Sequence, residues 1–156
     1  MLGKPRRVAV VSADSEGETT LNAFDRALLK AGIGNLNLVK VTSILPPDVQ
    51  ILRKLTEKIP EGSMVPVIMA CITSDLKGEK IAAALAIART KKGPGLVAEY
   101  TGRNIDKNKA VEEARYRVLN MANYRGLELS EPVFAVGVDH VVEKAGCALV
   151  AVVFID

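Results

Sequence analysis

The residues best placed to do chemistry lie in the segment 41–47, which reads Val-Thr-Ser-Ile-Leu-Pro-Pro. The pattern of residues 35–43 predicts a strand, and this strand delivers Thr42 and Ser43 to its end. The two prolines then bias the chain just beyond toward an extended path. Serine and proline are frequent where strands end, so the ordinary interpretation is a strand that closes in a rigid turn.

Two cysteines and one histidine are the other residues that could bind a metal or form a covalent link. Cys71 and Cys147 each stand in an apolar run, where a free cysteine acts as a small core residue. No CxxC pair or Cys/His cluster accompanies them, so we expect no metal site and no disulfide framework. His140 has no evident partner and is expected to be a surface or packed residue.

The composition is that of a single domain over residues 1–156, with 49% hydrophobic residues and 25% charged residues. Aromatic residues make up only 4%, which predicts an aliphatic core. The net charge of +3 is dispersed and forms no basic stripe, so we expect no nucleic-acid partner. No segment has the roughly 20 apolar residues of a membrane span, and the N-terminal apolar run is too short for a signal sequence. We therefore expect no membrane partner and a cytoplasmic location.

Hydrophobic periodicity predicts an alternation of strands and helices. Strands are expected at 6–13, 35–43, 64–73, 96–101, 127–142 and 147–154, and helices at 18–31, 48–58, 79–90 and 107–124. Such an alternation is typical of an α/β or mixed-sheet domain with helices packed on a sheet. It does not choose among an enzyme, a ligand-binding module and an assembly subunit.

Four segments carry a resemblance to a known family. They are Val41 to Pro47, Leu21 to Leu29, Thr73 to Ala84 and Gly95 to Tyr100. Together they resemble, in order and over roughly residues 5 to 155, the pyruvoyl-dependent arginine decarboxylases. In that family a strand that ends in Val-Ser-Ser or Val-Thr-Ser is followed by Ile-Leu-Pro-Pro. Thr42 stands where serine is commoner, a small departure because this residue contributes only its carbonyl.

The resemblance implies a self-processing precursor that is cut between Thr42 and Ser43. The Ser43 hydroxyl attacks the Thr42 carbonyl, and β-elimination of the resulting ester separates residues 1–42 from residues 43–156. Ser43 becomes a covalent pyruvoyl group, which serves as the electron sink that PLP provides in other decarboxylases. The resemblance implies that the Asn37 amide donates to the carbonyl under attack, as in an oxyanion hole. Taken alone, Asn37 is an ordinary polar strand residue.

Two carboxylates complete the implied site. Glu99 would protonate the substrate Cα after carbon dioxide leaves, which requires a raised pKa. Asp25 would pair with the guanidinium of arginine. Without the resemblance, Glu99 is a solvent-facing strand residue and Asp25 a helix-surface residue.

The resemblance further implies a four-layer α/β/β/α sandwich of mixed sheets with helices on the outer faces. It also implies a homo-oligomer, a trimer or a dimer of trimers, with active sites between subunits. The expected activity is decarboxylation of arginine to agmatine for polyamine synthesis. Two alternatives stay open: a pyruvoyl enzyme for another amino acid, such as ornithine or histidine, and a non-processed binding or assembly protein.

Overall fold

The computed structural model describes residues 1–156, which form nine strands and two helices. The strands are β1 (Arg7–Glu16), β2 (Asn37–Lys40), β3 (Ile44–Leu45), β4 (Gln50–Leu52), β5 (Met64–Ser74), β6 (Lys80–Ala88), β7 (Gly95–Arg103), β8 (Phe134–Val141) and β9 (Gly146–Phe154). The helices are α1 (Thr20–Lys30) and α2 (Lys107–Tyr124).

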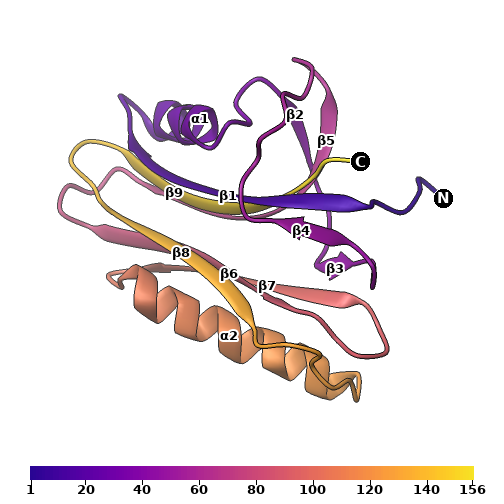
Figure 1. Ribbon diagram of the computed structural model, residues 1–156. Coiled ribbons are helices and arrows are strands. Elements are labelled where there is room, and N and C mark those ends of the chain that lie inside the picture. The colour runs from indigo at the N-terminus through magenta and orange to yellow at the C-terminus, as the bar shows by residue number, and fades with distance from the viewer.

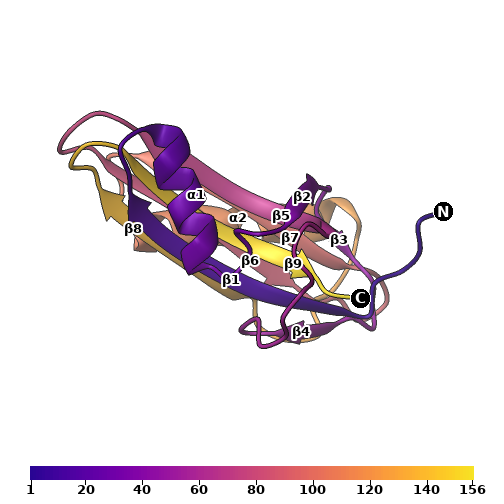
Figure 2. The ribbon, with the colours of Figure 1, turned by 90° about the horizontal axis from the view of Figure 1, so that it is seen from above.

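The elements stack in four layers, α/β/β/α (Figure 1). A five-stranded sheet has the order β2-β5-β9-β1-β4, and a four-stranded sheet has the order β3-β7-β6-β8. Helix α1 covers the outer face of the first sheet (Figures 1 and 2), and α2 covers the outer face of the second (Figure 1). The expected α+β sandwich is confirmed. Only the five-stranded sheet is mixed, because every pairing in the four-stranded sheet is antiparallel.

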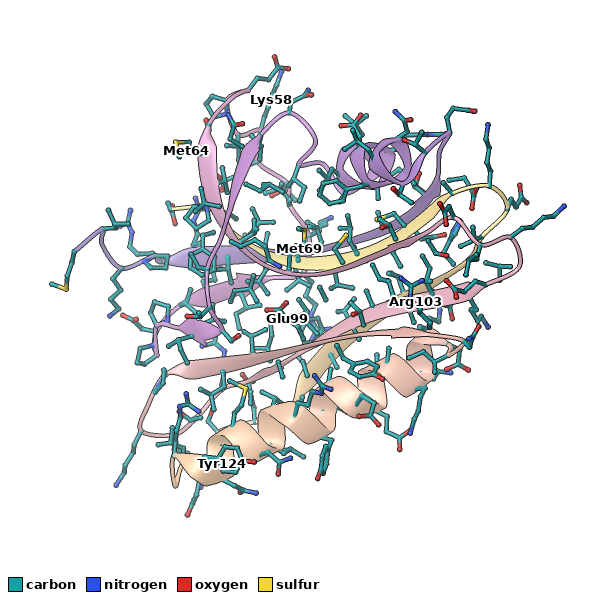
Figure 3. All side chains as sticks on the ribbon, turned by 180° about the vertical axis from the view of Figure 1, so that it is seen from behind. Lys58, Met64, Met69, Glu99, Arg103 and Tyr124 are labelled. Carbon is teal, nitrogen blue, oxygen red and sulfur yellow. The ribbon has the colours of Figure 1, made fainter.

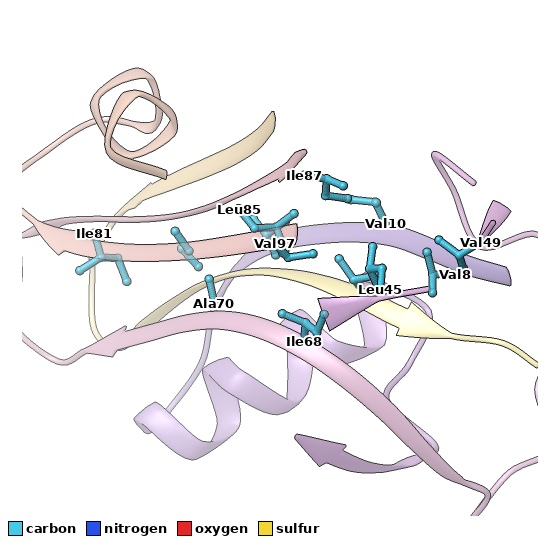
Figure 4. Packing of buried hydrophobic residues seen from close by; sticks show 14 of the residues in the cluster. Val8, Val10, Leu45, Val49, Ile68, Ala70, Ile81, Leu85, Ile87 and Val97 are labelled. Carbon is cyan, nitrogen blue, oxygen red and sulfur yellow. The ribbon is translucent and has the colours of Figure 1, made fainter. Parts of the chain in front are cut away.

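Three apolar layers hold the sandwich together. The layer between the sheets contains large aliphatic side chains from both, among them Ile68, Leu85 and Val97 (Figure 4). A second layer lies between α1 and the five-stranded sheet, and a third between α2 and the four-stranded sheet. The third is built largely of alanine, which allows the helix to approach the sheet closely. The aliphatic core expected from the composition is confirmed.

The segment 79–90, predicted as an alanine-rich helix, is instead the central strand β6. Alanine has the highest helix propensity, and this misled the prediction. The decisive pattern has a period of two, because Ile81 and Leu85 face the other sheet while Ala82 and Ala84 face α2. Pairing with β7 on one side and β8 on the other satisfies its backbone, so tertiary context overrides propensity.

The helix predicted at 48–58 is also wrong. Residues Gln50–Leu52 form the short strand β4, which runs parallel to β1 at the edge of the five-stranded sheet. Val49 is buried in the apolar layer between the sheets, and Ile51 packs against that layer, a spacing of two that fits a strand. The strand predicted at 127–142 begins only at Phe134, two residues after Pro132, which cannot donate a ladder hydrogen bond.

The two helices lie where the sequence predicts them, and each has a side-chain cap. Thr19 Oγ1 accepts from the backbone N–H of Asn22 (3.2 Å), and Asp106 Oδ1 accepts from that of Lys109 (2.9 Å). Such caps satisfy donors that have no partner within the helix. Neither helix has the length and apolar character needed to cross a membrane.

Candidate active site

The Thr42–Ser43 bond lies where the chain crosses from one sheet to the other. On the first side, the Val41 N–H donates to the Val67 carbonyl of β5 (2.9 Å). On the second side, Ile44 pairs with Leu96 of β7. The bond is therefore anchored at both ends by backbone pairing, with Thr42 exposed and Ser43 partly buried between the anchors.

The carbonyl of Ser43 is fixed as well, because it accepts a hydrogen bond from the Val97 N–H (3.0 Å). Leu45, two residues after Ser43, is fully buried between the sheets. The hydrogen bond and the burial of Leu45 together restrict the conformation of the backbone just after the serine. The arrangement fits a pyruvoyl group formed in place, since the only atoms that must change belong to the Thr42–Ser43 junction.

Glu99 lies two residues beyond Val97 on the same strand, so its side chain points to the same face, toward the other sheet. Figure 3 shows it in the space between the sheets. It lines a cavity of about 290 Å³ together with Lys40, Met69, Ala70, Cys71, Tyr100, Thr101 and Arg117. Burial raises the pKa of Glu99, and the positive charge of Lys40 partly offsets that rise. A carboxyl group in this state holds a proton to a higher pH than an exposed glutamate does.

The cavity opens at strand edges that have no partner within the chain. Pairing of β2 with β5 ends at Val67, and pairing of β3 with β7 ends at Leu96. Beyond these points, the second halves of β5 and β7 have one neighbouring strand each, β9 and β6. Unpaired edges and exposed apolar side chains mark interaction surfaces. Exposed apolar residues just before these points are Val39, Val41 and Ile44.

Asn37 and Asp25 are not brought to this cavity in the single chain. The amide Nδ2 of Asn37 donates to the Gly62 carbonyl (2.9 Å), across the pairing of β2 with β5. Asp25 is exposed on α1, on the outer face of the five-stranded sheet, whereas Glu99 faces the layer between the sheets. Their expected roles stay predictions.

Sequence reasoning predicted a site role only for Glu99 among the residues that line this cavity; it treated Cys71 as a core residue and gave Lys40 no role. The signal for Lys40 is its place three residues before Ser43, on the same strand that delivers the serine. Cys71 carries no comparable signal, because its run of apolar neighbours reads as a buried strand throughout.

His140 has partners that the sequence did not reveal. Its Nδ1 lies 2.7 Å from Asp14 Oδ2 and its Nε2 lies 2.6 Å from Glu16 Oε1, so β8 is tied to β1 of the other sheet. Glu16 also accepts from the backbone N–H groups of Glu143 (2.9 Å) and Lys144 (3.0 Å). Burial alone would raise the pKa of Glu16, but these hydrogen bonds lower it to about 2. Burial likewise opposes the charged imidazolium, but the two carboxylates outweigh burial and raise the pKa of His140.

We expect stability to fall as the pH rises above the ordinary histidine pKa of 6.5. Folding raises the pKa of His140, so the ring stabilises the fold fully below 6.5 and loses this effect as the pH rises through the folded pKa. His140→Gln should cost about 2 kcal/mol near pH 6, the scale of a charged hydrogen bond, and should flatten this slope. Urea unfolding of the wild type and of the His140→Gln variant between pH 6 and 9 measures how the free energy of unfolding depends on pH. His140 is the only histidine, so equal slopes in the two proteins would contradict the assignment.

The sandwich carries a serine peptide bond between its two sheets, and the strand that binds the serine carbonyl also holds a carboxyl group with a raised pKa, as the resemblance to pyruvoyl-dependent enzymes implies. The family model described as pyruvoyl-dependent arginine decarboxylase (PvlArgDC) matches residues 7–156. The chain belongs to this family, which makes it a carboxy-lyase with a covalent pyruvoyl group.

Three relatives, each described as a pyruvoyl-dependent arginine decarboxylase, illustrate the similarity. That of Methanocaldococcus jannaschii is 43% identical over 149 residues, covering 94% of this chain and 88% of the relative. That of Methanothermobacter thermautotrophicus is 44% identical over 150 residues, covering 96% and 97%. That of Pyrococcus abyssi is 39% identical over 150 residues, covering 96% and 94%.

Proposed function

We propose that the chain is the precursor of a cytoplasmic enzyme that converts arginine to agmatine and carbon dioxide. The observation that carries this proposal is the placement of Ser43, whose carbonyl is bonded to β7 two residues before Glu99. The names of the relatives supply the substrate, and the site supplies a place for the chemistry.

Maturation begins at the strand crossing. The Ser43 hydroxyl oxygen attacks the Thr42 carbonyl carbon, and the acyl group moves from nitrogen to oxygen. Elimination across the Cα–Cβ bond of residue 43 releases Thr42 as a carboxylate. The resulting enamine becomes an imine, and water replaces its nitrogen, which leaves as ammonia. Anchoring on both sides supports this scheme, because it holds the hydroxyl and the carbonyl close together.

The pyruvoyl group supplies the carbonyl that binds the substrate amine and draws electrons from Cα as carbon dioxide leaves. The Val97 N–H, which bonds the Ser43 carbonyl, polarises the adjoining amide for this purpose. Glu99 provides the proton that Cα receives. Its raised pKa favours the protonated form that this step requires.

A neighbouring subunit completes the site in this proposal. The unpaired edges of β5 and β7 and the exposed apolar residues beside them suit contact with a second copy of the chain. Such contact would bring a partner's helix α1, with its Asp25, toward the cavity beside Glu99. We propose a cyclic trimer, or a dimer of trimers. In such a ring each subunit uses one surface to contact one neighbour and a different surface to contact the other.

A substrate panel tests the specificity. Carbon dioxide release should be fastest with arginine and much slower with ornithine or histidine. Asp25→Asn should raise the KM for arginine about ten- to hundredfold, the loss expected for one charged hydrogen-bonded contact, with self-cleavage unaffected. Glu18→Gln, which removes an exposed carboxylate just before the same helix, is the matched control. An unchanged KM in the Asp25 variant would remove this residue from guanidinium binding, and preference for another amino acid would favour that alternative.

A further inference from the structure

The two cysteines of the chain lie side by side on neighbouring strands. Cys71 Sγ of β5 is 3.7 Å from Cys147 Sγ of β9. In the register of these strands, Cys71 pairs with Leu149 and Cys147 pairs with Thr73, so the cysteines are diagonal neighbours. Both side chains face α1, because directly opposite residues and residues two apart share a face. Both thiols are free.

The environments of the two thiols differ. Cys71 is partly exposed and lines the same cavity as Glu99 and Lys40, whereas Cys147 is fully buried in the layer beneath α1. A hydrogen bond from Cys147 and the charge of Lys40 lower the pKa of Cys71, against the effect of burial. The hydrogen bond to Cys71, burial and the nearby Asp14 raise the pKa of Cys147. Cys71 is thus the more accessible thiol and the one with the lowered pKa, and Cys147 is the buried thiol with the raised pKa, the division found in thiol pairs that oxidise in two steps.

We propose that Cys71 and Cys147 form an oxidisable thiol pair in the wall of the Glu99 cavity, and that a hydroperoxide closes it into a disulfide that reversibly lowers decarboxylation. Hydrogen peroxide transfers one oxygen to the Cys71 sulfur, and the other leaves as water. The Cys147 sulfur then attacks the oxidised sulfur, forms the S–S bond and expels a second water. In total, two thiols lose two hydrogens to one peroxide.

Closing the bond must disturb the cavity. Diagonal neighbours have their Cα atoms farther apart than the directly opposite positions that a disulfide bridges most easily. The strands must therefore shift toward each other, and β5 carries Met69 and Ala70 of the cavity wall. A disulfide formed under such constraint is readily reduced by a small thiol. The predicted loss of activity rests on the proposed function. The formation of the disulfide does not depend on it.

The test uses the processed enzyme, in which both cysteines lie on the 43–156 chain. After brief exposure to hydrogen peroxide, the intact mass of that chain should fall by two hydrogens. Iodoacetamide labelling under denaturing conditions should fall from two sites to none. Activity should drop about tenfold or more, as small displacements in an active site do, and should return with dithiothreitol.

Two variants and the unprocessed chain serve as controls. Cys147→Ala should gain oxygen at Cys71 without forming a disulfide, and Cys71→Ala should lose the sensitivity to peroxide. The Ser43→Ala chain should show the same mass and labelling changes as the wild type, which separates this proposal from the decarboxylase assignment. The proposal is overturned if both thiols of the wild-type chain remain open to iodoacetamide after peroxide, or if the disulfide forms and activity is unchanged.

Discussion

Replacing Ser43 by alanine is expected to leave one uncut 156-residue chain without decarboxylase activity. Alanine has no hydroxyl to attack the Thr42 carbonyl, and no group from which a pyruvoyl carbonyl could form. The loss of activity should be complete within the limits of the assay, because the cofactor itself is missing. Intact mass under denaturing conditions and release of carbon dioxide from arginine measure the two effects.

Thr42→Ala is the matched control for this experiment. Thr42 is exposed and contributes only its carbonyl, which alanine retains, so this chain should still separate into residues 1–42 and 43–156. Cleavage of the Ser43→Ala chain at the same bond would refute the processing scheme. An uncut wild-type chain would instead point to a stalled precursor or to a non-catalytic relative.

Glu99→Gln should reduce decarboxylation about 10²- to 10⁴-fold, the range that general acid catalysis contributes. Glutamine keeps the size and hydrogen-bonding reach of the side chain but holds no transferable proton. Self-cleavage should proceed, because the crossing is anchored through the backbone of Val41, Ile44 and Val97. In the wild type, activity should fall as the pH rises through the raised pKa of Glu99, since only the protonated acid can donate. Single-turnover rates across pH measure both effects.

Glu112→Gln is the control for the change of charge, because Glu112 is exposed on the outer surface of α2. Turnover of the Glu99→Gln enzyme close to the wild-type rate would exclude Glu99 as the proton donor. A loss that is accompanied by failed cleavage would assign Glu99 to maturation rather than to turnover.

Most elements could be predicted from the sequence, because their own periodicity agrees with the packing they enter. Helix α2 begins and ends at the predicted residues, and β1 and β5 lie where the apolar runs place them. Strand β6 could not be recognised, because its alanines favour a helix locally while the register with β7 and β8 decides the outcome. Strand β4 depends likewise on β1, a neighbour that is distant in the sequence.

For the site, the order of the motifs predicts roles for Ser43 and Glu99 through a resemblance. It could not reveal that Val97 bonds the Ser43 carbonyl or that Lys40 and Cys71 line the Glu99 cavity, because these are contacts between separate strands. The pairing of His140 with Asp14 and Glu16 is of the same kind, since more than one hundred residues separate the partners. Asn37 and Asp25 do not line this cavity in the single chain, so their roles stay predictions.

The position of β1 between β9 and β4 determines how the proposed cleavage would affect the association of the two fragments. Residues 1–42 contribute β1, α1 and β2, and both strands are hydrogen-bonded to strands of residues 43–156. The shorter fragment would therefore stay bound through strand pairing, and it could dissociate only if the five-stranded sheet were disrupted. The uncut chain would refold as one molecule. If the proposed cleavage takes place, refolding would instead require two fragments to associate, and its rate would depend on protein concentration.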